Sequence, residues 1–238
     1  GVGAEGRGWW VLADQDNFEH RYADPAIIDF LLEKGADPNV GRETFTGLHA
    51  AIMHRNDGEV ERLLAHGADP NVPLGTWTPL RRLTHSDFSF DRGWVGATPI
   101  WLAARFGTPR MVRMLADHGA DAKFVHRIEP IGGDGGDVRP QPGETTTTLM
   151  ALLGLSRGGD AWLPQIEDPA VREAEVLEKA KMLADHGVDL NLVGTGGRTA
   201  LDGAKQSEYP TVAAFLESLG AKAGTPAPAG AGRGVRPR

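Results

Sequence analysis

The sequence contains no cysteine, which excludes a disulfide scaffold, a Cys-ligated metal site and a thiol nucleophile. It also lacks any run of 18 apolar residues, so no segment has the length of a membrane-spanning helix. Basic residues are in the minority, because 25 Lys and Arg stand against 32 Asp and Glu, for a formal net charge of −7. Nonspecific nucleic-acid binding usually requires a basic surface, so we do not expect nucleic acid as a partner.

The chain has 238 residues, of which 40% are hydrophobic and 24% are charged. This length is enough to bury a hydrophobic core in one or two domains. Arginine outnumbers lysine, and glycine and alanine are abundant, a composition typical of a bacterial gene rich in G and C. The chain begins at Gly1, without an initiator methionine or a signal peptide, so we expect processing or a missing N-terminal part. The compartment therefore stays open.

One segment recurs five times with small changes. Its copies are LLEKGADPN at 31–39, LLAHGADPN at 63–71, LADHGADAK at 115–123, LADHGVDLN at 183–191 and the weaker LESLGAK at 216–222. Every copy has a leucine four residues before a glycine. A repeat of this kind predicts a fold built from stacked units.

A threonine motif precedes four of these copies. It reads TGLH at 46–49, TPIW at 98–101, TTLM at 147–150 and TALD at 199–202. Threonine caps helices, and proline in a first turn lacks an N–H that would be unpaired anyway. Glycine then tolerates the left-handed backbone that ends a helix, and Ala-Asp-Pro-Asn predicts a turn after it.

This pattern resembles the ankyrin repeat, whose unit is about 33 residues long. Gly187 and Gly220 are 33 residues apart, and Gly35 and Gly67 are 32 apart. The resemblance covers about 8–222 and implies an all-α solenoid of about five helix-turn-helix repeats with hairpin loops. The repeats we expect are roughly 6–39, 40–71, 72–123, 124–191 and 192–222, with the first helix at 25–34.

Two long insertions are expected in hairpin-loop positions, at 73–97 and 126–144, and a third at about 155–173 between two helices. The last copy has Glu217 at a usually apolar position, which indicates a terminal cap. At the other end Trp9 and Trp10 begin without a polar capping helix, so we expect further repeats before them. Residues 223–238, rich in Pro, Gly and Ala, predict a disordered tail.

Three glycine-rich segments partly match known ligand-binding motifs. Residues 1–6 spell the dinucleotide pattern GxGxxG but no strand precedes them, and GTGGRT at 194–199 is too short for a P-loop and has Arg where Lys is required. GGDGGD at 132–137 matches the start of a calcium-binding repeat that works only in tandem copies. We interpret all three as loops, with weak cation binding left open for the third.

Three histidines recur at the same position of the repeat, which could indicate a metal site. His66, His118 and His186 each stand directly before a repeat glycine. Adjacent helices pack 8–10 Å apart, whereas a shared zinc needs each nitrogen about 2 Å away. We therefore expect these side chains at helix C-termini, near the last carbonyls, and His49 as a hydrogen bonder that braces its loop. No cofactor or metal is expected.

Candidate binding residues come from two sources. The insertion at 73–97 has aromatic and arginine side chains, the types enriched at interface hot spots: Trp77, Arg81, Arg82, Phe88, Phe90 and Trp94. The alternative is that this insertion folds back on the solenoid and its aromatics form a small core. The ankyrin resemblance adds exposed candidates on the concave face: Arg42, Glu43, Phe45, Met53, Trp101, Arg105 and Phe106. The alternative is that each of them packs locally, with Phe45 and Trp101 partly buried.

The functional expectation is a non-enzymatic scaffold that binds a partner protein through its concave face and inserted loops, within a longer polypeptide. No nucleophile elbow, HExxH or kinase signature occurs in the sequence. The alternative is an enzyme or small-ligand site formed between the 73–97 and 126–144 insertions. A structural spacer, in which no surface residue matters, is a third hypothesis.

Overall fold

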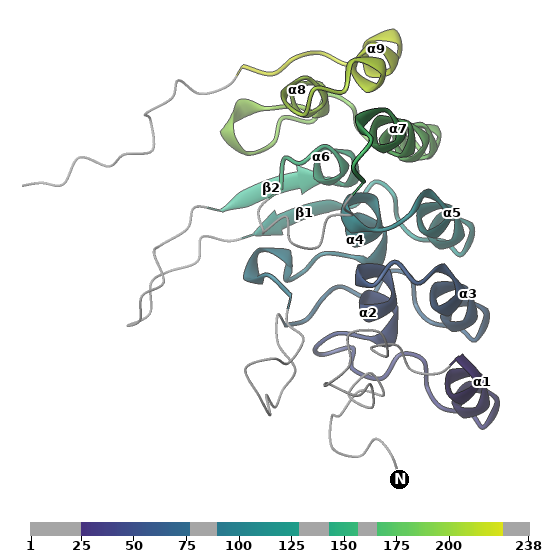
Figure 1. Ribbon diagram of the computed structural model, residues 1–238. Helices are drawn as coiled ribbons and strands as arrows, with labels where there is room; N and C mark the ends of the chain where they lie inside the picture. Colours follow the sequence, from purple (N-terminus) through teal and green to yellow (C-terminus); the bar gives the residue numbers. More distant parts are fainter. Residues whose placement is uncertain (1–24, 77–89, 129–142, 157–165, 226–238) are drawn as a thin grey trace, which may run out of the picture.

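The computed structural model describes residues 25–76, 90–128, 143–156 and 166–225. Its helices stand in two columns joined by loops that project to one side (Figure 1). The helices are α1 (Pro25–Glu33), α2 (Gly47–Met53), α3 (Asp57–Ala65), α4 (Pro99–Phe106), α5 (Pro109–Asp117), α6 (Thr148–Leu152), α7 (Pro169–Asp185), α8 (Ala200–Gln206) and α9 (Pro210–Ser218). The strands are β1 (Val125–Ile128) and β2 (Glu144–Thr147), and short 3₁₀ turns span Arg92–Trp94 and Thr195–Gly197.

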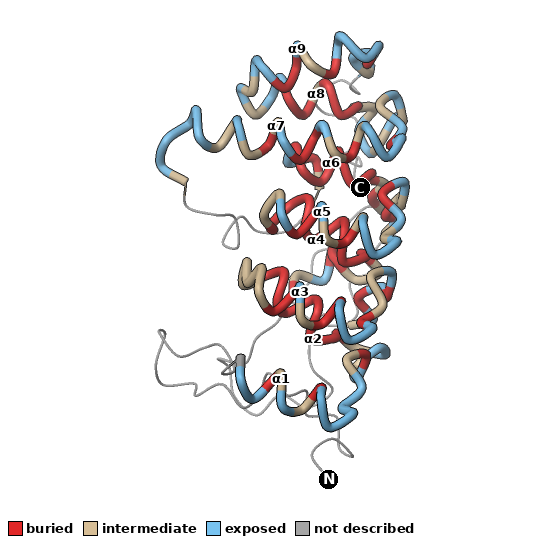
Figure 2. The backbone as a smooth tube through the Cα atoms, turned by 90° about the vertical axis from the view of Figure 1, so that its right-hand side faces the viewer, coloured by how far each residue is buried: buried red, intermediate tan, exposed pale blue. Residues whose placement is uncertain are grey.

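The inner column consists of α2, α4, α6 and α8, and each of these helices packs on the next. The outer column contains α3, α5, α7 and α9, each paired with the inner helix that precedes it. Buried residues line the space between the columns (Figure 2), and Leu102, Ala103 and Ala151 are fully enclosed. Small alanines allow neighbouring inner helices to approach closely, so the core is continuous along the stack.

Inner helices begin at the predicted threonines. Thr147 accepts a hydrogen bond from the backbone N–H of Met150 (3.1 Å), the capping role expected of this residue. Thr46 instead pairs with a side chain, because His49 Nδ1 lies 2.9 Å from its hydroxyl and 3.1 Å from its backbone nitrogen. Thr199 pairs with Asp202 in the same way, at 3.0 Å and 2.7 Å.

The turn after each outer helix is built as the sequence predicts. All five repeat glycines, from Gly35 to Gly220, have φ between 74° and 86°, the left-handed region that ends a helix. A following aspartate accepts from the backbone two residues on, as Asp37 does from Asn39 (2.9 Å). Asn39 in turn donates to Gly67 O (3.0 Å) and accepts from Asp69 N–H (2.7 Å) of the next turn.

This asparagine bridge recurs between neighbouring turns. Asn71 joins Gly119 O and Asp121 N, and Asn191 joins Gly220 O and the backbone nitrogen of residue 222. At the remaining junction Lys123 occupies the asparagine position, and its side chain lies against Gly187 instead. The stack is therefore connected by the same pair of hydrogen bonds at three junctions, with one exception.

One expected helix is confirmed and one expected insertion needs correction. The helix expected at 25–34 is α1, which ends at Glu33. The insertion expected at 155–173 is too long, because α7 already begins at Pro169 with Asp168 as its N-cap. The fold is mostly helical, but β1 and β2 pair antiparallel, with Val125 opposite Thr147 and Ile128 opposite Glu144. The segment at 126–144 therefore begins and ends in a hairpin.

Some predictions fall on residues outside those described. These are the part of the first repeat before residue 25 with its possible extension, the motifs at 1–6 and 132–137, and most of the tail at 223–238. At the start of that tail, the backbone nitrogen of Gly224 donates to Asp202 (2.8 Å). None of the helices that the structure describes combines the length and apolar character of a membrane span.

Candidate interaction surface

Four successive loops on the hairpin side are hydrogen-bonded into one layer. Thr44 O accepts from Gly75 N–H (2.6 Å), which joins the loop before α2 to the start of the 73–97 segment. The end of that segment reaches the β1–β2 hairpin, because Val95 O lies 2.9 Å from His126 Nε2. The hairpin continues to the last loop, where Thr145 N–H donates to Thr195 Oγ1 (2.7 Å).

The predicted partner-binding residues fall into three groups. Arg42 and Glu43 are exposed. The buried group comprises Phe45, Met53, Phe90, Trp94, Trp101, Arg105 and Phe106, each at most 5% exposed. Trp77, Arg81, Arg82 and Phe88 lie outside the described residues. The exposure expected on the concave face is therefore wrong for Phe45, Met53, Trp101, Arg105 and Phe106. Phe90 and Trp94 follow the alternative in which the insertion folds back on the solenoid. A role of these residues in partner binding stays a prediction.

Ring packing explains the burial of the aromatics. Phe90 meets Phe45 edge-on at a centroid distance of 5.0 Å, and it also approaches His49 at 6.4 Å. Trp94 stacks at a tilt on Phe106 of α4, with centroids 4.6 Å apart. The described end of the 73–97 insertion therefore covers the hairpin side of α2 and α4, which is the folded-back arrangement that the sequence left as an alternative.

Arg105 is buried because it bridges two inner helices. Its guanidinium donates to the carbonyl oxygen of Ser156 (3.0 Å) and to the Ser156 hydroxyl, beyond the end of α6. It also lies over the ring of Phe106, 5.1 Å from the centroid. A side chain held by these contacts stabilises the stack, and a partner could reach it only by disrupting them.

The histidines behave as the sequence predicts. His66 Nδ1 lies 2.9 Å from Arg62 O, and His118 Nδ1 lies 2.7 Å from Met114 O, so each ring bonds the last turn of its own helix. His186 occupies the same C-cap position of α7. His49 braces its loop through Thr46, and complete burial lowers its pKa to about 4.

The sequence did not predict an ion network that surrounds one buried lysine. Lys179 of α7 donates to Ala104 O and Gly107 O (both 3.1 Å), the carbonyls at the end of α4. Arg55, from the turn between α2 and α3, also donates to Gly107 O (3.1 Å) and pairs with Glu175 (3.0 Å). Burial lowers the pKa of Lys179 to about 8. Only the spacing of Glu175 and Lys179 on one helix signalled part of this network.

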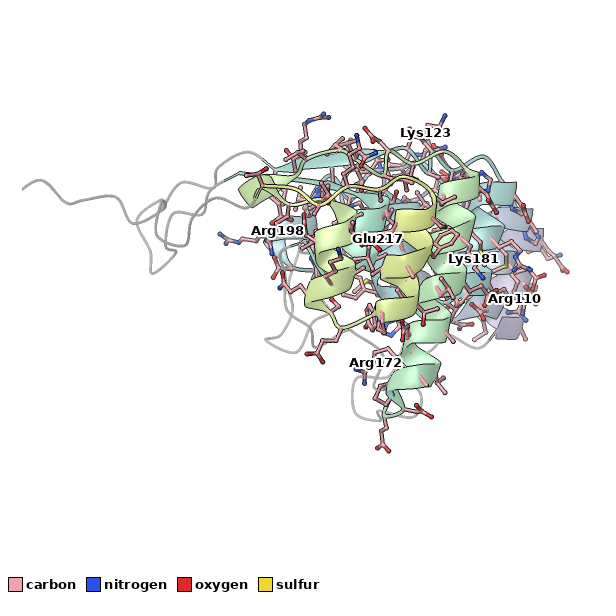
Figure 3. All side chains as sticks on the ribbon, turned by 90° about the horizontal axis from the view of Figure 1, so that it is seen from above. Arg110, Lys123, Arg172, Lys181, Arg198 and Glu217 are labelled. Carbon is pink, nitrogen blue, oxygen red and sulfur yellow. The ribbon has the colours of Figure 1, made fainter. Side chains whose placement is uncertain are left out.

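Ion pairs join successive outer helices. Arg62 binds Asp29 (3.0 Å), Arg110 binds Glu61 (2.7 Å) and Arg113 binds Glu178 (3.1 Å), so α1, α3, α5 and α7 are linked in series. Figure 3, seen along the stack, shows Arg110 and Lys181 on this side and Arg198 on the opposite, hairpin side.

Comparison with known families decides what kind of repeat this is. The family model for ankyrin repeats, in three copies, matches residues 20–126, a range that includes α1 to α5 and the loop layer up to His126. Residues 20–126 carry ankyrin repeats. No curated protein sequence matches this chain. Ankyrin repeats are generally non-enzymatic modules for protein–protein interaction, so a protein partner is the class of ligand that the family indicates.

Proposed function

We propose that this ankyrin-repeat protein is a non-enzymatic scaffold that binds a partner protein through its hairpin side. In this proposal the stack holds five repeats, the first of them formed by α1 with the segment before it and the others by the four helix pairs. The hairpin loops and the insertions supply the contact surface, and the inner helices supply its support.

The continuous loop layer is the observation that carries this proposal. Hydrogen bonds join each loop to the next, so their exposed side chains are held in fixed relative positions. A preformed surface loses little conformational entropy when it binds. Because α2 and α4 are buried beneath the layer, contacts to a partner come from the loops, where Arg42, Glu43 and Arg127 are exposed.

A charge-reversal comparison tests the side used. A partner captured from lysate with the wild-type chain is identified by mass spectrometry, purified and titrated by calorimetry. We expect Arg42→Glu with Arg127→Glu, on the hairpin side, to weaken its binding at least tenfold. The matched control is Arg110→Glu with Lys181→Glu on the outer helices, where we expect less than a twofold change. Loss of binding in the control alone would contradict the proposal.

The alternative of a small-ligand site between the two insertions has a structural basis at one point. The bases of the two segments meet where His126 contacts Val95. His126 is 1% exposed, and burial lowers its pKa below the usual value. A substrate would have to reach an enclosed, neutral imidazole there, so the observations favour the scaffold.

A further inference from the structure

Four buried polar atoms with no hydrogen-bond partner lie where α4 meets the β1–β2 hairpin. Within the part of the chain that the structure describes, no donor or acceptor reaches Trp101 Nε1, Thr98 Oγ1, His126 Nδ1 or Thr146 Oγ1. All four residues are at most 5% exposed. Buried polar groups of native proteins are nearly always paired, with protein atoms or with ordered water, so a group of four requires an explanation.

Independent contacts bring these residues to one place. The rings of Trp101 and His126 pack with centroids 4.9 Å apart. His126 stands directly opposite Thr146 across the strand pair, so the two side chains share one face of the hairpin. Thr98 caps the helix one turn before Trp101.

The sequence explains why the atoms lack partners. In two other helices the hydroxyl of the capping threonine donates a hydrogen bond to the side chain three positions later. His49 accepts from Thr46, and Asp202 accepts from Thr199. Trp101 stands in that position after Thr98 and has a donor but no acceptor. With tryptophan in this position, the Thr98 hydroxyl has no acceptor there, and the indole N–H adds a second donor without a partner.

His126 supplies the acceptor. Its Nε2 lies 2.9 Å from Val95 O, and a carbonyl only accepts, so Nε2 carries the proton. Burial lowers the pKa of this imidazole, which keeps the ring neutral near pH 7. Nδ1 is then an acceptor without a proton, and the neighbouring residues contribute one N–H donor and two hydroxyls that also lack partners.

We propose that an internal water molecule binds at this junction, accepts from Trp101 Nε1–H, donates to His126 Nδ1 and bonds the threonine hydroxyls. Buried waters typically make about three hydrogen bonds, and a neutral, mixed set of donors and acceptors suits water better than an ion. The bound water fastens the hairpin that carries the 126–144 insertion to α4. This site is independent of the proposed partner binding.

Nuclear Overhauser measurements between water and indole protons test the site. In ¹⁵N-labelled full-length protein, the Trp101 indole N–H, assigned by loss of its signal in Trp101→Phe, should show cross-peaks with water. Laboratory-frame and rotating-frame effects should have opposite signs, the signature of a long-lived water. Trp94 is the internal control, because its side chain is equally buried and its nitrogen is not among the unpartnered atoms.

Two variants separate bound water from exchanging hydroxyl protons. The cross-peak should persist in Thr98→Val with Thr146→Val, which removes both hydroxyls, and should disappear in His126→Phe, which removes the acceptor. Thr145→Val is the matched control on the other face of the strand and should change nothing. The proposal would be overturned if the wild type showed no cross-peak or if Trp94 showed an equal one. It would also be overturned if the cross-peak disappeared in the double threonine variant and persisted in His126→Phe.

Discussion

Removal of one inter-repeat asparagine should destabilise the stack by an amount set by its burial. Asn39 is 8% exposed, and it both donates to Gly67 O and accepts from Asp69 N–H. An alanine there loses both hydrogen bonds, each of which contributes about 1 kcal/mol net, so Asn39→Ala should lower the free energy of unfolding by about 2 kcal/mol. Asn71 makes the same two bonds in an exposed setting, where water replaces them, so Asn71→Ala should cost about 1 kcal/mol.

Urea unfolding followed by circular dichroism measures these differences, with Arg42→Ala as an exposed control three residues from Asn39. Amide hydrogen exchange adds a local readout, because the Asp69 N–H should lose protection in Asn39→Ala and keep it in the control. The reasoning is refuted if Asn39→Ala matches the control within about 0.5 kcal/mol, a typical surface effect. It is also refuted if the exposed bridge proves the costlier one to remove.

Three further predictions concern single side chains. Lys123→Asn should restore the missing bridge to Gly187 O and Asp189 N–H and raise the urea midpoint, by about 1 kcal/mol in stability; no gain would show that this junction has a different geometry. Burial raises the pKa of Glu59 to about 7 from 4.5, so the folded protein binds a proton that the unfolded chain does not, and stability relative to Glu59→Gln should fall by about 2–3 kcal/mol as pH rises through that window. Burial lowers the pKa of Lys179 to about 8 from 10.5, so the unfolded chain binds the extra proton, and stability relative to Lys179→Met should rise between pH 8 and 10.5, by up to about 3 kcal/mol. If the free energy of unfolding depended on pH equally in the wild type and in Glu59→Gln, or equally in the wild type and in Lys179→Met, the corresponding prediction would be contradicted.

The sequence was sufficient wherever the signal is local and periodic. The leucine and glycine of each copy lie in one helix and its end, so the position of α1 and the left-handed turn at Gly35 could be predicted without any tertiary contact. Phe90 was different, because an aromatic side chain in an insertion serves a partner or the protein's own core equally well. Its contact with Phe45, across about 45 residues of chain, is a tertiary choice that spacing does not encode.

The buried network shows the same limit more sharply. Glu175 and Lys179 are one helical turn apart and look like an ordinary surface pair. In the fold Lys179 is buried against the carbonyls that end α4, and Glu175 pairs with Arg55, which is 120 residues away. Because a charge becomes costly only when the rest of the fold encloses it, no single-sequence pattern distinguishes this pair from an exposed one.

These observations converge on the junction between the α4–α5 and α6–α7 pairs. Here Lys123 replaces the bridging asparagine, so the connection used elsewhere in the stack is absent. Other contacts cross the same boundary: Thr148 Oγ1 donates to Ala122 O (2.5 Å), β1 pairs with β2, Lys179 binds the end of α4, and Arg105 donates to Ser156 O. Each repeat of a solenoid is stabilised mainly by its neighbours. Coupling along this stack therefore changes in kind at one boundary, from an asparagine bridge between turns to bonds made by a buried threonine and a buried lysine. The titration of Lys179 in the folded protein should report directly on that boundary.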